Sequence, residues 1–330
     1  MYVLLNINML KGPIIVTGGS GFLGANLIRK LNKAGHKNII IIDNYDDSKF
    51  KNIRSLTFAD YITYTKGLDY IKVALKGQQP SYILHVGANA DVLVRDPEIM
   101  MEANFEHSKF YLHWALEHKI PLVYASSSAV YGNSRKSSVE ERTEDPHNTY
   151  AWSKWMFDQY VLANLHTFNS PVIGLRLFNI FGVGEFHKDK NASLPYRFFS
   201  FIRGKGFIDL FDREIKRDYV WVEDVADVFI DMMNNRSVSN GIYNLGGGNP
   251  ISHETVANIV AESFRSRGLK SPTDDLIKKI AMPDELVDKF QFYTCAENIL
   301  DSIAVKCAGN EAKIKTYINQ LIDISYEGKI

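Results

Sequence analysis

The chain has 330 residues, enough for one large domain with a smaller lobe, and its 45% hydrophobic and 23% charged content is ordinary for a globular protein. Because 38 basic side chains balance 38 acidic ones, no net field attracts nucleic acid, which we exclude as a partner. The two cysteines, Cys295 and Cys307, lie outside any CxxC pattern, so we expect two free thiols in a reducing cytoplasm and no metal site.

Residues 1–11 precede the first predicted strand, and we interpret them as an N-terminal extension of unassigned purpose, with Met9 as an alternative start. They lack a basic leader and a small-residue cleavage site, so they do not resemble a signal peptide. No apolar run in the chain is long enough to span a bilayer. We therefore expect a cytoplasmic protein with no membrane partner.

Short apolar runs alternate with helical segments along the first half of the chain. A helix is expected over residues 22–34, where leucines recur on one stripe and Gly35 follows as a stop. Alternating strands and helices predict an α/β fold with a doubly wound parallel sheet, the Rossmann architecture. The expected buried strands are residues 13–16, 38–43, 82–86, 121–125 and 172–176.

Beyond Asn179 the periodicity fails, and we expect loops and a helix up to about residue 215. Strand-like sequence returns at 219–222 and 241–245, before a C-terminal helical region. These features predict a smaller C-terminal α/β substrate lobe beside the main sheet. The predicted dinucleotide-binding domain comprises residues 12–179 and 217–250, and the predicted substrate-binding lobe comprises residues 180–216 and 251–330.

A glycine-rich turn joins the first strand to the first helix. Gly19, Gly21 and Gly24 form a G-x-G-x-x-G motif, which overlaps a G-x-x-G-x-x-G motif that begins at Gly18. Such glycines permit a tight turn, close approach of the backbone to a pyrophosphate, and close packing of the helix. A purely structural turn is the alternative, but the flanking strand and helix favour a dinucleotide site.

An acidic residue, Asp43, ends the second strand about twenty residues beyond the glycines, where it would bind the adenosine ribose hydroxyls. A carboxylate at this position ordinarily favours NAD over NADP. However, Asn44 and Lys49 follow closely and could neutralise a 2′-phosphate. The choice between NADP and NAD therefore stays open.

A tyrosine and a lysine lie one helical turn apart, at Tyr150 and Lys154. A neighbouring ammonium and a cationic nicotinamide both favour the phenolate, so Tyr150 is a candidate general base, and Lys154 could also bind the nicotinamide ribose. A surface pair at this spacing is common. The serine segment 126–128 strengthens the catalytic interpretation, because Ser127 follows a buried strand at the edge where such sheets bind ligands, although serines there also cap turns.

In combination these segments resemble the extended short-chain dehydrogenase/reductase family, which includes NAD-dependent epimerases and dehydratases. The resemblance also includes residues 217–226 and 244–248, and it extends over nearly the whole chain from Pro13. More distinctive segments are similar to those of epimerases that act on an ADP-linked heptose. These segments are residues 48–53, 59–61, 186–188, 192–193, 283–284 and 290–291.

The resemblance implies that a bound dinucleotide removes hydride from C6 of the heptose and returns it to the opposite face, in the synthesis of a lipopolysaccharide inner-core precursor. It assigns the two acid/base roles to Tyr150 and Lys188, assisted by Lys154 and Ser127. Without the family, Lys188 would read as a solvated lysine in a polar loop. The resemblance further implies one tightly bound NADP or NAD per subunit, a nucleotide-sugar substrate and a homo-oligomer.

The motifs and the resemblance together also assign binding residues. Cofactor contacts are expected from Gly18, Gly21, Phe22, Leu23, Gly24, Asp43, Asn44, Lys49, Val86, Gly87, Ala88, Asn89, Ala90, Asn104, Lys154, Ile180 and Lys188. Substrate contacts are expected from Ser127, Asn179, Lys190, Arg197, Phe211, Asp212, Arg213, Arg217 and Phe290. Departures from the family pattern at Val86, Asn89, Lys190 and Arg197 concern substrate detail more than reaction class.

Other interpretations stay open. Another nucleotide-sugar epimerase, such as a hexose 4-epimerase, would use the same tyrosine, lysine and serine. A 4,6-dehydratase needs an Asp-Glu pair beside the serine segment, where this chain has Ser128 and Ala129. The alternative from a different class is a dinucleotide-sensing regulatory protein, but such proteins usually lose the catalytic tyrosine, whereas Tyr150 and Lys154 are both present.

Overall fold

The computed structural model describes residues 10–90, 96–234, 238–287 and 290–326, so the predicted extension lies mostly outside the described residues. The chain divides into two compact units. Unit 1 comprises Met1–Val130, Pro146–Leu177 and Glu223–Asn244, and unit 2 comprises Tyr131–Asp145, Phe178–Val222 and Leu245–Ile330. The assignment of one domain to the dinucleotide and one lobe to the sugar stays a prediction.

Unit 1 is built on a seven-stranded sheet of order β11-β6-β5-β4-β1-β2-β3. The strand pairs from β3 to β6 are all parallel. The predicted doubly wound parallel sheet is thereby confirmed, with β3 as a strand that the periodicity did not predict. The strands are β1 (Ile14–Thr17), β2 (Ile39–Asp43), β3 (Asp60–Thr63), β4 (Tyr82–His85), β5 (Leu122–Ser127), β6 (Val172–Leu177) and β11 (Gly241–Leu245).

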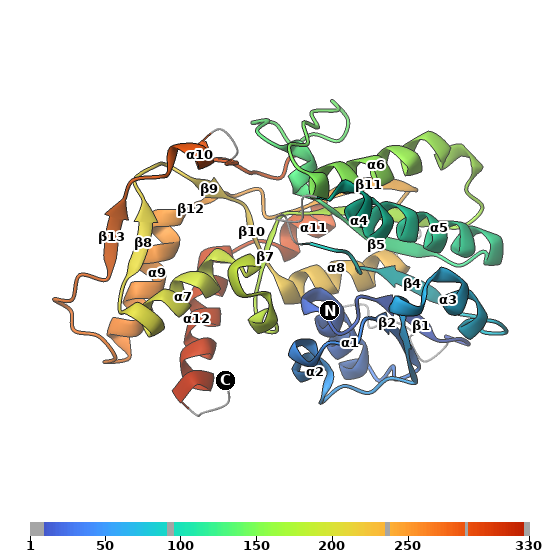
Figure 1. Cartoon of the computed structure of the whole chain (residues 1–330), viewed down its shortest axis with the longest axis horizontal. Helices are drawn as coiled ribbons and strands as arrows, with labels where there is room; N and C mark the ends of the chain where they lie inside the picture. Colours follow the sequence, from blue (N-terminus) through green and yellow to red (C-terminus); the bar gives the residue numbers. More distant parts are fainter. Residues whose placement is uncertain (1–9, 91–95, 235–237, 288–289, 327–330) are drawn as a thin grey trace. The chain divides into compact units, whose positions relative to one another are not determined.

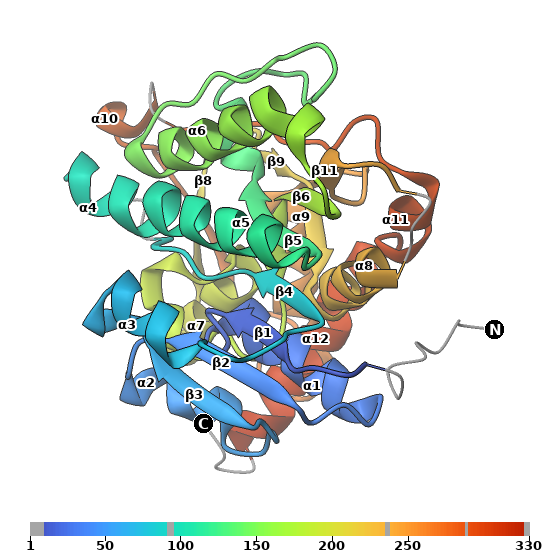
Figure 2. The ribbon, with the colours of Figure 1, turned by 90° about the vertical axis from the view of Figure 1, so that its right-hand side faces the viewer.

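Helices cover both faces of this sheet. Figure 2 shows α4, α5 and α6 side by side along one face. On the other face α1 lies beside α8, and the Lys30 ammonium is 2.9 Å from the Asp227 carboxylate. As predicted, α1 ends before Gly35, which has a φ of 90°. The helices are α1 (Phe22–Lys33), α2 (Asp47–Ile53), α3 (Leu68–Ala74), α4 (Pro97–Met101), the π-helical turn η3 (Glu102–Glu106), α5 (His107–His118), α6 (Thr149–Asn164) and α8 (Val222–Asn234).

A buried ion pair attaches α6 to the sheet. Asp158 of α6 accepts hydrogen bonds from Arg176 Nε at 2.8 Å, from Ser126 Oγ at 2.8 Å and from Tyr124 Oη at 3.1 Å. The side chains of Asp158 and Arg176 are both 0% exposed. Charges this deep persist only where they are paired and hydrogen-bonded, so each partner depends on the other.

Unit 2 contains three two-stranded sheets and its own helices, which confirms the smaller α/β lobe. The run at 219–222 does not join the main sheet, because β10 pairs with β7 and Val222 begins α8. The predicted C-terminal helical region also contains a strand, β13, which pairs with β8. The elements are β7 (Asn179–Phe181), η6 (Phe186–Asn191), α7 (Leu194–Lys205), β8 (Ile208–Phe211), β9 (Lys216–Arg217), β10 (Tyr219–Trp221), β12 (Ile251–Ser252), α9 (His253–Ser266), β13 (Ile277–Ile280), α10 (Asp284–Val287), α11 (Asp301–Lys306) and α12 (Asn310–Tyr326).

An aromatic core holds unit 2 together, with α7, α9 and α12 packed against one another (Figure 1). The ring of Phe181 lies 5.3 Å from that of Trp221 and 6.1 Å from that of Tyr317, measured between centroids. Side chains of this size bury large apolar areas and fix the orientation of the helices that carry them. The C-terminal helix is therefore part of the core of this unit.

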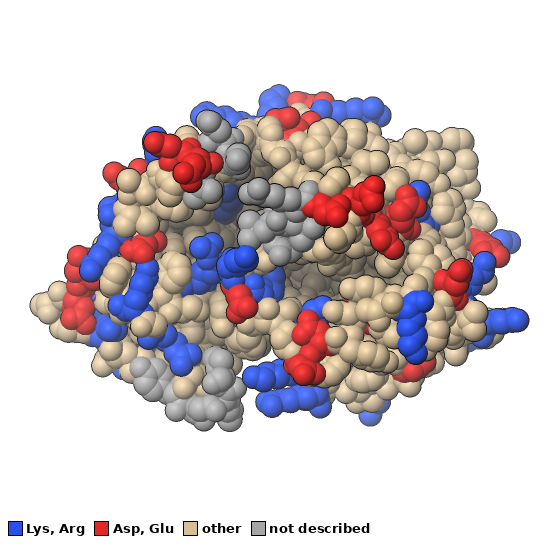
Figure 3. All heavy atoms as spheres, viewed as in Figure 1, with Lys and Arg blue, Asp and Glu red and all other residues tan. Residues whose placement is uncertain are grey.

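On the face shown in Figure 3, both acidic and basic side chains are present. Within the described ranges, no helix combines the length and the apolar character needed to cross a bilayer.

We expect Arg176→Met to lower the free energy of unfolding by about 3–5 kcal/mol, because it leaves the Asp158 carboxylate buried without its cation. The matched control is Arg267→Met, which removes an ion pair with Asp323 whose side chains are 42% and 50% exposed. That exposed pair contributes about 1 kcal/mol or less. Urea unfolding followed by circular dichroism measures both, and equal losses would contradict the buried role of Arg176.

Candidate active site

The glycine turn brings the end of β1 against the segment that follows β4. Gly18 has a φ of 65°, and a Cβ placed on it would lie 2.6 Å from the Cα of Gly87. A Cβ on Gly24 would lie 2.1 Å from the Gly18 carbonyl oxygen. Side chains are therefore excluded at both positions, and α1 begins after Gly21 without a side-chain cap, at the kind of helix start that binds phosphates.

Asp43 is buried at the end of β2, and its carboxylate is held on both oxygens. Oδ2 accepts from the backbone N of Ser20 at 3.0 Å and from its Oγ at 2.6 Å, and Oδ1 accepts from the backbone N of Asn44 at 2.8 Å. Lys49 Nζ lies 3.5 Å from the same carboxylate and donates to Asn44 Oδ1 at 2.7 Å. A ribose hydroxyl and a 2′-phosphate would thus each find a partner here.

The end of β5 and the start of α6 bring three predicted catalytic residues together. Asn148 caps α6 by accepting a hydrogen bond from the backbone N of Ala151 at 2.8 Å. The Tyr150 hydroxyl is hydrogen-bonded to the Ser127 side chain, and burial raises the pKa of Tyr150 while this bond lowers it. The predicted pairing of the phenol with the serine is thus present in the geometry of unit 1.

Lys154 is buried one turn further along α6. Its Nζ donates to the carbonyl oxygen of Ala125 in β5 at 3.0 Å. Burial lowers the pKa of Lys154 to about 8, and the nearby Asp158 carboxylate opposes that shift. The side chain therefore still carries its proton over most of the neutral range, one turn from the phenol.

Asn104 links the segment after β4 to the turn that carries Tyr150. It is 0% exposed in the π-helical turn η3, and its Oδ1 accepts from the backbone N of Asn89 at 2.8 Å. Its Nδ2 donates to the Asn89 carbonyl and to Ser153 Oγ, each at 2.9 Å. Ser153 in turn donates to the Tyr150 carbonyl at 2.8 Å. The Asn104 side-chain amide therefore positions other groups of the candidate site.

His85, which the sequence analysis did not select, continues this series of hydrogen bonds. Its Nδ1 lies 2.7 Å from Thr17 Oγ1 and its Nε2 lies 2.9 Å from Ser108 Oγ. Because Ser108 Oγ donates its own proton to the Asn104 carbonyl, it accepts from Nε2, which carries the ring proton, and Nδ1 accepts from Thr17 Oγ1. Burial lowers the pKa of His85 well below its ordinary value, so the ring is neutral. A polar residue at the end of a buried strand was the available signal.

In unit 2, Arg217 forms an aromatic and cationic cluster with two other predicted substrate residues. Its guanidinium lies 5.4 Å from the centroid of the Phe290 ring, which meets the Phe211 ring edge-on at 6.4 Å. Burial lowers the pKa of Arg217 to about 10, so the group stays charged at neutral pH. A planar cation beside aromatic rings suits a nucleoside diphosphate.

The buried acid Asp218 fixes the backbone next to Arg217. Its carboxylate accepts from the backbone N of Gly247 at 2.8 Å, and from those of Gly248 and Ala296 at 2.9 Å each. The sequence motif around Arg217 and the glycines at 246–248 are therefore parts of one hydrogen-bonded bracket. Sequence inspection showed both segments, but not their contact.

The remaining predicted residues of unit 2 are less closely grouped. Asn179, beside Ile180 in β7, donates its amide to the Asp218 carbonyl at 3.0 Å. Burial, with smaller effects from the charges of Arg217 and Arg197, lowers the pKa of His253 to about 3. Three further residues are exposed: Lys190, Asp212 and Arg213.

Lys188 lies in η6, where burial lowers its pKa and the carboxylate of Glu185 opposes that shift. Lys188 is thus partly withdrawn from solvent, whereas Asp189 and Lys190 of the same loop are exposed. The sequence analysis gave Glu185 no role.

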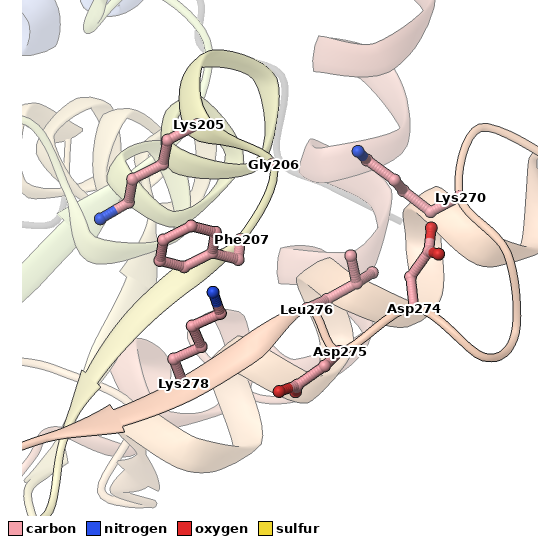
Figure 4. A pocket seen from close by; sticks show the side chains of 8 residues that line it. All are labelled: Lys205, Gly206, Phe207, Lys270, Asp274, Asp275, Leu276 and Lys278. Carbon is pink, nitrogen blue, oxygen red and sulfur yellow. The ribbon is translucent and has the colours of Figure 1, made fainter.

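A separate pocket of about 270 Å³ opens near the end of α7 and the start of β13 (Figure 4). Lys278 Nζ lies 3.7 Å and Lys205 Nζ 5.0 Å from the centroid of the Phe207 ring. No predicted site residue lines this pocket, so it is distinct from the clusters above. Its lining residues are Lys205, Gly206, Phe207, Lys270, Asp274, Asp275, Leu276 and Lys278.

Comparisons with known proteins agree with this geometry. A family model described as the NAD dependent epimerase/dehydratase family matches residues 14–246. The ADP-L-glycero-D-manno-heptose-6-epimerase of Brachyspira hyodysenteriae is 38% identical over 291 residues, which are 86% of this chain and 89% of that protein.

Two solved structures extend the comparison. The ADP-L-glycero-D-manno-heptose-6-epimerase of Helicobacter pylori has a TM-score of 0.81 at 26% identity, covering 94% of this chain and 96% of that one. The UDP-N-acetylglucosamine 4-epimerase of Methanobrevibacter ruminantium has a TM-score of 0.80 at 21% identity, covering 97% of this chain and 100% of that one. The second likeness shows a shared fold.

We expect Gly24→Ala to weaken dinucleotide binding by about 5–150-fold, because the added methyl group meets a backbone oxygen and overpacking of this kind costs about 1–3 kcal/mol. Gly204→Ala is the control, since an added Cβ there has no heavy atom within 4 Å and Gly204 lies in α7. Titration of the tryptophan fluorescence with NADH and NADPH measures both. Unchanged affinity in the Gly24 variant would remove the glycine turn from the cofactor site.

Proposed function

The chain belongs to the NAD-dependent epimerase/dehydratase family, and from that membership we propose that it interconverts the C6 epimers of an ADP-linked D-manno-heptose. The enzyme is an isomerase that uses bound NAD or NADP and acts in the synthesis of a lipopolysaccharide precursor. The observation that carries the proposal is the Tyr150 phenol hydrogen-bonded to Ser127, one turn from the buried Lys154. The heptose is supported by the 38% identity to the Brachyspira enzyme.

The glycine turn fits a dinucleotide, because a Cβ at Gly18 or Gly24 would clash with the backbone of Gly87 or Gly18. Glycine thus permits the tight turn that lets backbone amides approach a pyrophosphate. When bound, the oxidised dinucleotide would supply the hydride acceptor. The Lys154 ammonium, one turn from the phenol, opposes the effect of burial and favours the Tyr150 phenolate. Tyr150 then removes the proton of the sugar hydroxyl, while Ser127 orients that oxygen.

Epimerisation also needs proton transfer at the opposite face of the transient ketone, and we assign it to Lys188. Burial lowers the pKa of this lysine, which brings an ammonium closer to the neutral range in which it can both give and take a proton. A hexose 4-epimerase remains less favoured, since the likeness to a 4-epimerase at 21% identity concerns the fold. In the same proposal, the Arg217, Phe211 and Phe290 cluster binds the ADP moiety. We also propose that the protein forms a homo-oligomer and acts in the cytoplasm.

The test is incubation of the purified protein with ADP-D-glycero-D-manno-heptose, with the C6 configuration followed by proton NMR. We expect the second epimer to accumulate until the two epimers reach equilibrium, without added oxidant or reductant, since the reaction has no net redox change. Inertness with this sugar, together with turnover of a UDP-hexose, would replace the assignment with a 4-epimerase. Cofactor binding without turnover of either sugar would indicate a sensor.

We expect Tyr150→Phe and Lys188→Ala each to lower kcat by about 10²–10⁴-fold, which is the usual contribution of a general acid or base. Cofactor affinity should stay within about twofold, because the glycine turn is untouched. One control is Tyr160→Phe, which lies on the same helix as Tyr150 and removes a hydroxyl bonded to His113 of α5. The other is Lys279→Ala, which removes an exposed lysine of β13. Full activity of the Lys188 variant would contradict the second acid/base group.

A further inference from the structure

A fully buried carboxylate, Glu185, lies three residues before Lys188 in unit 2 and is 0% exposed. Its Oε1 accepts hydrogen bonds from Ser193 Oγ at 2.8 Å, from Tyr317 Oη at 2.9 Å and from the backbone N of Gly182 at 3.2 Å. Its Oε2 accepts from the backbone N of Ser193 at 2.5 Å. Four donors therefore converge on this one side chain.

These donors come from three parts of the unit. Gly182 follows β7, Ser193 is the N-cap of α7, and Tyr317 belongs to the C-terminal helix α12. The carboxylate thus ties the turn before η6 to two helices of the aromatic core. A side chain of this kind decides where the following residues can lie, because a buried acceptor without its donors would cost about 1–3 kcal/mol.

The donor set suits the ionised form of Glu185. A proton on Oε1 would displace one of its three donors, and a proton on Oε2 would make that oxygen a weaker acceptor for the Ser193 N–H. Burial raises the pKa of Glu185, whereas the charge of Lys188 and the hydrogen bonds from Ser193 and Gly182 lower it. Geometry and charge therefore work together against the burial effect.

Lys188 supplies the positive charge that acts on this carboxylate. The backbone N of Lys188 donates to the Glu185 carbonyl at 2.9 Å, so both residues belong to the same turn. Of the other titratable groups, Tyr317 and Tyr196 also interact with Glu185, and burial is the main cause that raises the pKa of each. Both phenols stay neutral, so among the described groups that act on Glu185 the compensating positive charge is that of Lys188. Arg203 lowers the pKa of Tyr196, and Asp189 raises it.

We propose that Glu185 is a positioning residue that anchors the η6 turn and keeps the Lys188 side chain protonated for transfer to the sugar oxygen. The inference rests on the proposed role of Lys188. As hydride returns to C6, the ammonium gives its proton to the oxygen on that carbon and becomes a neutral amine. In the reverse direction the amine takes the proton back while hydride leaves. The carboxylate itself exchanges nothing with the substrate.

The experiment compares the pH dependence of kcat for Glu185→Gln and Tyr317→Phe, with each C6 epimer as substrate. Glu185→Gln removes the anion that favours the ammonium, so the limb set by Lys188 should move to lower pH by about one unit or more, in both directions of reaction. Tyr317→Phe removes an anchoring hydrogen bond but keeps the charge. Its profile should superimpose on that of the unaltered protein, although its Tm falls.

A purely structural role would move both profiles alike, so equal shifts, or no shift in Glu185→Gln, would overturn the inference. If Gln at this position prevents folding, Glu185→Asp and Glu185→Asn form a second pair that differs only in charge, and the same difference in profile is expected. If Lys188→Ala keeps full turnover, the proposed role of Lys188 is wrong and this inference is wrong with it. If Lys188→Ala loses turnover but the pH profile of Glu185→Gln does not shift, only the inference about Glu185 is wrong.

Discussion

A buried ammonium that donates to a strand carbonyl sets the spacing between α6 and β5. Lys154 cannot be charged in an apolar interior without such a bond, and Asp158, one turn further, supplies the opposite charge. Asp158 is in turn held by Arg176. Because this polar core fixes the helix against the strand, Tyr150 meets Ser127 where β5 ends. The position of the candidate catalytic pair therefore depends on the buried polar cluster of Lys154, Asp158 and Arg176.

Unit 2 uses the same principle with the signs reversed. Asp218 and Glu185 are buried acids surrounded by donors, and each adjoins a basic residue of the proposed site along the chain. Asp218 directly follows Arg217, and Glu185 precedes Lys188 by one turn of η6. Burying a carboxylate is costly unless several donors meet it, so its position is narrowly defined. The backbone positions of the adjacent residues Arg217 and Lys188 are therefore narrowly defined as well.

Much of the architecture could be predicted because its signals are local. Continuous apolar runs marked five of the parallel strands, and the glycines with Gly35 marked both ends of α1. The strand β13 gave no such signal, since its exposed Ile-Lys-Lys-Ile sequence becomes a strand only by pairing with β8. Likewise, the sequence did not show how the loop before Lys188 is anchored. Tyr317, which donates to Glu185, lies 132 residues further along the chain.

Periodicity and residues within a few positions of one another were enough to predict the sheet class, the glycine turn with Asp43, and the one-turn spacing of Tyr150 and Lys154. The packed structure was needed to show that His85 is neutral between Thr17 and Ser108, that Asn104 supports the tyrosine turn, and that Tyr317 donates to Glu185. These are contacts between segments distant along the chain. No pattern encodes them, since burial and hydrogen-bond partners exist only once the elements have packed.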